Sequence, residues 1–429
     1  MSLKPVKVLL FTGLSLSGYT VLAQNIDRPF ENNPYSRYGL GEEQNAINPA
    51  LKAMGSITAA YQDPYTVNTD NPASYAHIKH FTYEAGGEGR IRTILSANEK
   101  YKTGNAAVSY LNLAIPMGKY AGMLVGFRPQ TKVGYYLYDN SQTTLIGPSS
   151  LSYTGDGSTN YFFIGGAGTY KGFSLGANVG YIFGSIQQSS WLKTLSTDKS
   201  LSNSEFTRFS TVGGMYYKLG ATYETSLGKD FILRVGAQAN LQQDIQSDLT
   251  EFWVSHPFYA SDTTGSDTAL YRKGVKEKIT LPSSYTGGIQ LAKSDKWMIG
   301  VNYKTTDWSK FNNQNIPDSV GSSAYKLSIG GEVTPNSLNL YKYFQRVTYR
   351  AGFYYGQDFV QINGKQASYY ALTFGLSLPI RRSTDRIHTA FEIGKMGDKS
   401  PGNIQQNFIR FSLGLSLSDK SWFVKRKYE

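Results

Sequence analysis

Long runs in which every second residue is apolar constrain this chain more than any other feature. Phe173–Phe183 is one, and similar runs cover 231–242 and 409–417. Strict alternation predicts a strand with two unlike faces. These runs match the roughly 9 to 11 residues that cross a bilayer at a tilt, whereas soluble strands average about five or six. The pattern therefore favours an all-β fold, an antiparallel barrel that crosses a membrane.

Similar patterns recur to the end of the chain and predict about fourteen strands, an even number as bacterial single-chain barrels require. The predicted strands are 80–95, 105–115, 120–138, 160–170, 173–186, 206–225, 231–247, 278–292, 297–306, 325–333, 347–360, 368–380, 386–395 and 405–417.

Connections between the predicted strands alternate in length. The short ones are 116–119, 171–172, 226–230 and 293–296. The long ones are 139–159, 187–205, 248–277 and 307–324. Outer-membrane barrels have short periplasmic turns and long extracellular loops, so both termini are expected in the periplasm. Two connections break the pattern: 334–346 is long and 361–367 is short. Either a small periplasmic helix fills 334–346, or the strand count slips there.

The two ends of the chain lie outside the predicted barrel at 80–417. Lys4 and Lys7 precede an apolar run that ends at Ala23, and this arrangement predicts a signal peptide over 1–23. Gly and Ser interrupt the run, which makes a membrane anchor the weaker interpretation. Residues 24–79 do not alternate and are expected to form a hatch or plug, and 418–429 a periplasmic tail.

Composition narrows the class further. The chain has no Cys, so neither disulfides nor thiolate metal sites are available. The net charge of +12 raises nucleic-acid binding as an alternative, but the basic residues are scattered singly, so we expect none. Lipopolysaccharide and other outer-membrane lipids are the expected neighbours of a cationic barrel. Paired tyrosines near the strand ends are typical of interfacial aromatic girdles.

The hatch region carries a motif that resembles a known family. Met54-Gly55 is followed by Asp63-Pro64 and then by Asn71-Pro72-Ala73, just before the first predicted strand. This spacing resembles the hatch of the FadL family of outer-membrane transporters. The segment Asn33-Pro34-Tyr35-Ser36-Arg37 resembles the branch that includes PorV. The resemblance implies a fourteen-stranded, hatch-gated barrel.

Two functions follow from that resemblance. One is passive, porin-like uptake of hydrophobic small molecules such as fatty acids, which leave the lumen sideways through a strand defect. Pro129 is the candidate defect, because proline removes a ladder hydrogen bond; a plain bend is the alternative. The other function is a non-transporting barrel that is a subunit or docking partner of a type IX-like secretion or envelope-assembly complex. A polar, fully plugged lumen would favour the second.

Catalytic chemistry is weakly represented, so no enzyme, cofactor or metal site is expected. The four histidines are dispersed, and His388 with Glu392 lacks a nucleophile motif. Charged residues within the predicted strands are expected to face the lumen, because a charge that faces lipid is costly. They form either a structural network or a substrate track. These residues are Glu84, Glu88, Arg90, Arg92, Lys218, Glu224, Arg234, Lys326, Arg350 and Arg410.

Overall fold

The strands of the protein form one antiparallel sheet that closes on itself. The computed structural model describes residues 31–96, 99–144, 147–195, 201–257, 266–293, 296–313, 320–339, 341–381, 383–400 and 402–419. The predicted signal peptide (1–23) and residues 420–429 of the predicted tail lie outside these ranges. Strand β18 (Gln405–Asp419) pairs with β2 (Phe81–Leu95) along their whole lengths, which closes the barrel.

The wall has 14 strands, as predicted. Besides β2 and β18, ten strands run unbroken: β3 (Lys100–Pro116), β4 (Ala121–Thr144), β5 (Gly147–Tyr170), β6 (Phe173–Thr194), β7 (Ser202–Leu227), β12 (Trp297–Asp307), β14 (Ser323–Val333), β15 (Thr348–Ile362), β16 (Lys365–Pro379) and β17 (Arg386–Met396). Two adjacent strands are each broken in two: β8 (Phe231–Asn240) continues as β9 (Gln243–Pro257), and β10 (Asp267–Leu281) continues as β11 (Ser284–Lys293). The breaks face each other, because Asn240 pairs with Ser284 and Gln243 with Leu281.

The two faces of the wall differ as alternation predicts. On β18, Leu413 is 50% exposed on the outer face, whereas Ser412 beside it is 2% exposed and faces the lumen. The outer band of exposed Leu, Ile, Val, Phe and Tyr side chains runs round the barrel. Such a band suits contact with lipid, since apolar surface that water would otherwise cover is transferred to hydrocarbon.

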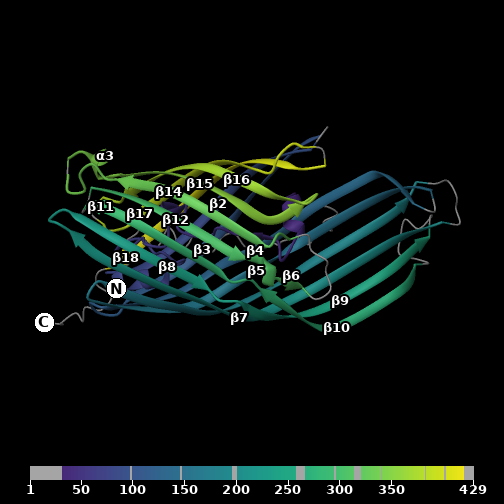
Figure 1. Ribbon diagram of the computed structural model, residues 1–429, viewed down its shortest axis with the longest axis horizontal. Coiled ribbons are helices and arrows are strands. Elements are labelled where there is room, and N and C mark those ends of the chain that lie inside the picture. Colours follow the sequence, from purple (N-terminus) through teal and green to yellow (C-terminus); the bar gives the residue numbers. More distant parts are fainter. Residues whose placement is uncertain are drawn as a thin grey trace, which may run out of the picture.

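One part of the wall is much taller than predicted. The long connections expected at 139–159, 187–205 and 248–277 are largely strand: β4 ends at Thr144, and β5 begins at Gly147. Figure 1 shows β4–β7, β9 and β10 running well past the ends of β15 and β16. The prediction of loops was wrong because strands beyond the lipid carry polar residues on both faces and lose the alternation.

Outward-facing charges mark where this extension leaves the lipid band. On the outer face, Asp248 of β9 pairs with Lys276 of β10 at 2.5 Å, and both side chains are exposed. Asp244 lies 2.8 Å from Lys278 on the same face. A charge on the lipid face costs about 2–4 kcal/mol at the bilayer midplane, so β8 and β11 cross the membrane and β9 and β10 stand outside it.

The two irregular connections do not disturb the strand count. A short helix, α3 (Tyr343–Arg346), lies in the long connection between β14 and β15. A tight turn at Asn363-Gly364 joins β15 to β16, and both residues have positive φ (50° and 77°). The short helix was one of the two alternatives predicted for 334–346. No helix in the described ranges is long and apolar enough to cross a membrane.

Candidate functional site

Residues 31–78, the described part of the segment predicted to be a hatch and called the hatch below, pack inside the barrel. They contain η1 (Pro34–Arg37), β1 (Glu42–Glu43), α2 (Pro49–Lys52) and η2 (Pro72–His77). Each helical turn begins at an Asn-Pro pair. The side-chain oxygens of Asn33, Asn48 and Asn71 accept a hydrogen bond from the backbone N–H two residues on, at 3.2, 2.8 and 3.1 Å. Asn is a strong N-cap, and proline at N1 has the φ a helix needs. Two of these pairs lie in motifs recognised in the sequence, whereas Asn48-Pro49 was missed.

Glycines on the inner face of the wall let the hatch backbone approach closely. A Cβ on Gly236 would lie 1.9 Å from the Ala59 carbonyl oxygen, and one on Gly122 would lie 2.1 Å from that of Tyr75. At Gly220 it would lie 2.0 Å from Asn71 Oδ1, and at Gly176 2.5 Å from the carbonyl carbon of Pro72. The alternating glycines of these strands therefore shape the lumen to fit the hatch.

The predicted hatch motif is buried and touches the wall at two places. Met54 is 0% exposed, and Gly55 turns with φ of +71° beneath β15. The Gly55 N–H donates to Thr373 Oγ1 on β16 at 2.9 Å. Asn71 donates from Nδ2 to the carbonyl oxygens of Ala237 and Ala221 at 3.3 and 3.4 Å, which ties η2 to β8 and β7. Pro72 and Ala73 follow in η2, also buried.

A network of buried charges joins the hatch to β2. The Arg92 guanidinium is 0% exposed and lies 3.1 Å from Glu31 and 2.5 Å from Glu42. Arg90 lies 3.2 Å from Glu42 and 2.7 Å from Glu88, which in turn pairs with Lys52 of α2. Removing one partner of a buried ion pair costs about 3–5 kcal/mol, because the other charge is left uncompensated. The network therefore opposes withdrawal of the hatch.

Neighbouring cations keep Glu42 and Asp70 of the hatch ionised. Burial alone would raise the pKa of Glu42, but Arg92 and Arg90 outweigh it and hold that pKa at about 2. Burial would likewise raise the pKa of Asp70, and Lys218 and Arg128 outweigh it and lower that pKa well below its usual value. Lys218 and Arg128 lie 2.9 and 3.0 Å from Asp70. Asp70 therefore fixes the second half of the hatch to β7 and β4.

The remaining predicted lumen charges also have partners on the inner face. Arg234 lies 2.6 Å from Glu224, Arg350 2.7 Å from Glu332, and Arg410 2.8 Å from Glu392. Glu84 accepts hydrogen bonds from Val67 N–H, Asn48 Nδ2 and Ser416 Oγ at 3.0, 3.1 and 2.7 Å. Lys326 lies over the Tyr354 ring, with its Nζ 4.0 Å from the ring centroid. These charges are therefore paired with other groups on the inner face of the wall or in the hatch.

His388 is buried and forms hydrogen bonds with two serines of the neighbouring strands. It is 0% exposed, and its two ring nitrogens lie 2.5 and 3.1 Å from the hydroxyls of Ser377 and Ser416. The imidazole is closed off from any substrate. Within the described ranges, no group of three or more His, Asp or Glu side chains is arranged to hold a metal ion.

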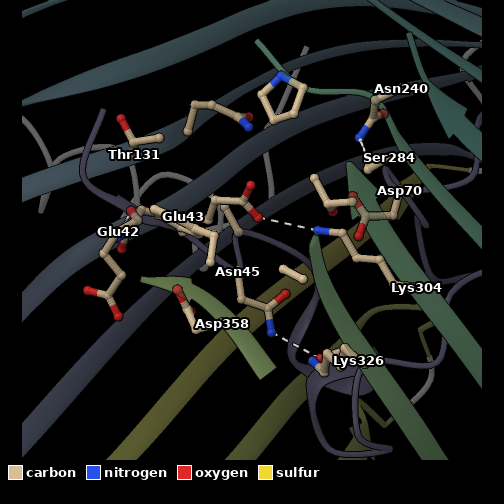
Figure 2. Close-up of a pocket in the computed structure, with 18 of the residues that line it drawn as sticks. Glu42, Glu43, Asn45, Asp70, Thr131, Asn240, Ser284, Lys304, Lys326 and Asp358 are labelled. Carbon is tan, nitrogen blue, oxygen red and sulfur yellow. Dashed lines mark hydrogen bonds and ion pairs between the residues drawn. The ribbon is translucent and has the colours of Figure 1, made fainter. Parts of the chain in front are cut away.

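A cavity of about 320 Å³ remains between the hatch and the inner face of the wall. Its lining combines Glu43, Lys304 and Asp358 with the aromatic residues Trp308 and Phe359. Figure 2 shows Glu43 directed toward Lys304, at 3.3 Å. The volume lies at the lower end of the range for small-molecule pockets, about 300–1,000 Å³, but the lining is far more charged than in a typical hydrophobic pocket.

Pro129 lies at an irregular point of the wall. The register between β4 and β5 shifts between Pro129 and Thr131. In the described part of the chain, β3 and β4 pair only from Leu111↔Phe127 to Pro116↔Gly122, so their pairing ends two residues before Pro129. Pro129 therefore lies at a bulge, two residues beyond the end of the described ladder between β3 and β4, and a lateral exit there stays a prediction.

Comparisons with known proteins agree with this geometry. The Pseudomonas putida toluene transporter TodX superposes with a TM-score of 0.60 at 16% identity, over 87% of this chain and 98% of that one. A FadL homologue from Pseudomonas aeruginosa superposes with a TM-score of 0.59 at 13% identity, over 87% of this chain and 98% of that one. The Ralstonia pickettii toluene transporter TbuX superposes with a TM-score of 0.57 at 16% identity, over 89% of this chain and 100% of that one. A search of curated proteins found no match.

The fold and its hatch define an outer-membrane β-barrel of FadL-like architecture. The family model named BamG matches residues 6–429, so the chain belongs to the BamG family. The predicted resemblance to FadL is confirmed for the fold, while the PorV branch stays a prediction. These structural neighbours are described as toluene transporters and a FadL homologue, and at 13–16% identity they show the fold of this chain alone.

Proposed function

We propose that this protein is a closed outer-membrane barrel that acts as a subunit or docking partner of a secretion or envelope-assembly complex. The observation that carries this proposal is the hatch locked by buried ion pairs. Glu31, Glu42 and Asp70 are each held by cations of the wall. Passage through the lumen into the periplasm would require such a plug to move, whereas a docking barrel needs it to stay in place.

The tall strand extension supports the same function. Strands β4–β7, β9 and β10 carry an ordered polar sheet beyond the lipid band, with exposed ion pairs such as Lys276–Asp248 on its outer face. An ordered sheet of this height offers a rigid surface to another protein, while transport of a small molecule does not require it. In this proposal, the short turns and both termini lie in the periplasm.

Purification in mild detergent from native membranes tests the proposal. We expect a protein partner in stoichiometric amount and no steady conductance when the purified barrel is placed in planar bilayers. A barrel that purifies alone and conducts ions would contradict it.

Uptake of hydrophobic small molecules is the second candidate, favoured by the cavity above the hatch. Trp308 and Phe359 stack there with ring centroids 3.7 Å apart and give it one apolar side. The structural neighbours include toluene transporters and a monoaromatic hydrocarbon channel. Mass spectrometry of protein purified without added ligand distinguishes the two: a co-purified fatty acid or hydrocarbon supports uptake, and its absence together with a protein partner supports docking.

A further inference from the structure

One connection at the end of the barrel with the short turns is unlike the others. Residues 334–347, here called the α3 loop, join β14 to β15 with fourteen residues. The other connections at this end have two to six residues: 117–120, 171–172, 228–230, 294–296 and 380–385. Figure 1 shows α3 beyond the ends of β14 and β15, at the opposite end of the barrel from the tall extension. A hairpin closes with far fewer residues, so the length of this loop calls for another role.

Polar side chains hold the α3 loop in a defined shape. Asn339 Oδ1 accepts hydrogen bonds from the backbone N–H groups of Tyr341 and Lys342, both at 2.9 Å. Asn339 Nδ2 donates to Gln345 Oε1 at 2.5 Å, and the Asn336 N–H donates to the Gln345 carbonyl oxygen at 2.8 Å. Asparagine side chains that bond the nearby backbone in this way fix a turn. The amides of the loop are therefore used within the loop itself.

Hydrogen bonds also fix the α3 loop to the wall. The Thr334 N–H donates to the Lys296 carbonyl oxygen at 2.7 Å, and the Thr334 and Thr348 hydroxyls lie 2.8 Å apart. The Tyr349 hydroxyl donates to the Phe344 carbonyl oxygen at 3.1 Å. The loop is therefore anchored at both of its ends and through α3, so the side chains on its outer surface are held in place.

The large apolar side chains of the α3 loop point away from it. Leu338 is 85% exposed, Tyr341 98% and Phe344 75%, whereas Leu413 in the lipid band is 50% exposed. The usual arrangement is inverted, because the amides lie inside the loop and the apolar groups lie outside. Apolar groups gathered on an ordered surface are unfavourable in water and mark a site of contact with another apolar surface.

The charge of the α3 loop is wholly positive. The loop contains Lys342 and Arg346 and has no Asp or Glu. In the part of the chain that the structure describes, neither cation forms an ion pair. Lys342 directly follows Tyr341, and Arg346 lies two residues after Phe344. An apolar pocket with carboxylates on its rim would therefore match this surface in both polarity and charge.

A lipid surface also suits aromatic side chains that lie beside cations. Lipid, however, surrounds the barrel on every side, and the other connections at this end meet it with two to six residues. The α3 loop occupies one sector only, between β14 and β15. A neighbour that is present in one sector is a protein rather than the bilayer.

We propose that the α3 loop is the docking site for a partner protein, which receives Leu338, Tyr341 and Phe344 in an apolar pocket with an acidic rim. This rests on the proposed docking function and assigns the contact with the partner. Tyrosine and arginine are among the residues that carry most of the binding energy at protein interfaces, and the loop presents both. In the proposed orientation, the contact is made on the periplasmic side.

Substitutions in the full-length protein test the site. The amount of partner that purifies with the barrel from native membranes is compared between wild type and two double variants. We expect Tyr341→Ser with Phe344→Ser to reduce it at least ten-fold, and Lys342→Glu with Arg346→Glu to do the same. The first variant removes apolar contacts and the second reverses the charge. All four side chains point away from the wall or lie in the loop, and heat-modifiable gel mobility checks that each variant is folded.

The turn between β3 and β4 provides a matched control. Tyr120 is 60% exposed there, and Lys119 Nζ lies 5.3 Å from the centroid of its ring. This pair has the same chemistry as the α3 loop at the same end of the barrel. Tyr120→Ser with Lys119→Glu should leave the amount of partner unchanged.

A fluorescent label distinguishes protein from lipid as the neighbour of the loop. The chain has no native Cys, so Phe344→Cys and, on the outer face of β14, Val333→Cys can each be labelled at one site. The labelled barrels are placed in nanodiscs of phosphatidylethanolamine and phosphatidylglycerol that contain lipid with a nitroxide on its acyl chain. We expect the label at Val333 to be quenched and the label at Phe344 to be quenched at least five-fold less.

Three results would overturn the proposal. Equal quenching at the two positions would show that the α3 loop rests in the bilayer. Retention of the partner by either folded double variant would overturn the site while leaving the docking function intact, and so would an equal loss from the control. Wild-type protein that purifies without any partner would instead contradict the docking function itself.

Discussion

Glu42 shows how single carboxylates hold the hatch. It faces Arg92, Arg90 and Arg410, whereas its neighbour Glu43 makes one exposed pair with Lys304. We expect Glu42→Gln to destabilise hatch docking by about 3 kcal/mol. The matched Glu43→Gln should cost at most about 1 kcal/mol, because exposed ion pairs contribute little. Hydrogen exchange of the hatch amides measures both; equal protection in the two variants would contradict this account.

Acid should loosen the hatch through the same carboxylates. The pKa of Glu42 is about 2 in the folded protein against an ordinary value of 4.5. Because the folded value is the lower one, its stabilisation is complete above pH 4.5 and is lost as pH falls toward 2. Asp70 shifts in the same direction. The stabilisation that these two carboxylates supply should therefore persist down to about pH 5 and be lost below it, which hydrogen exchange of the hatch amides measures. Hatch protection that does not fall below about pH 5 would contradict this role of Glu42 and Asp70.

Wall glycines offer a test of the fit between hatch and barrel. Gly220→Ala places a Cβ against Asn71 Oδ1, whereas Gly287 on β11 has nothing within 4 Å. Overpacking of this kind costs about 1–3 kcal/mol. We expect Gly220→Ala to raise the rate of proteolysis within 31–78 in folded protein and Gly287→Ala to leave it unchanged. Similar rates would mean that the hatch does not rest on these glycines.

At the scale of elements, an arginine substitution can distinguish the lipid-facing side of β8 from its lumen-facing side. Val235 is 44% exposed on the lipid side, and Gln238 lines the cavity. Val235→Arg should reduce assembly into membranes, since Arg on the lipid face costs about 2–4 kcal/mol near the midplane. Gln238→Arg should assemble almost normally. The folded fraction, read from heat-modifiable gel mobility, compares them; an equal loss would mean that the faces are assigned wrongly.

The strand number and faces could be predicted because lipid on one side and the lumen on the other impose alternation. The strand ends could not be predicted, because residues such as Asp244 and Asp248 lie beyond the lipid. There both faces of a strand meet water, so the alternation that marks a strand is lost. The break between β8 and β9 was also missed. Leu241 continues the apolar alternation there, so the pattern carries no sign of it.

The candidate site was predicted only in part. Met54-Gly55 and Asn71-Pro72-Ala73 led to the expectation of a hatch, and the charged wall residues were named individually, but their partners in residues 31–78 were not. Glu31 and Lys132 lie 101 positions apart, and only the closed barrel brings them together. The two-residue strand β1 is too short to alternate, so its place along β4 had no signal in the sequence.

For the whole molecule, the central claim is that the hatch closes the barrel. Single-channel recording in planar bilayers tests it most directly, with intact protein compared with a variant that lacks residues 33–74. We expect the intact protein to stay closed and the deletion, verified as folded by heat-modifiable mobility, to conduct steadily. A folded deletion variant that stays closed, or intact protein that conducts equally well, would contradict the account.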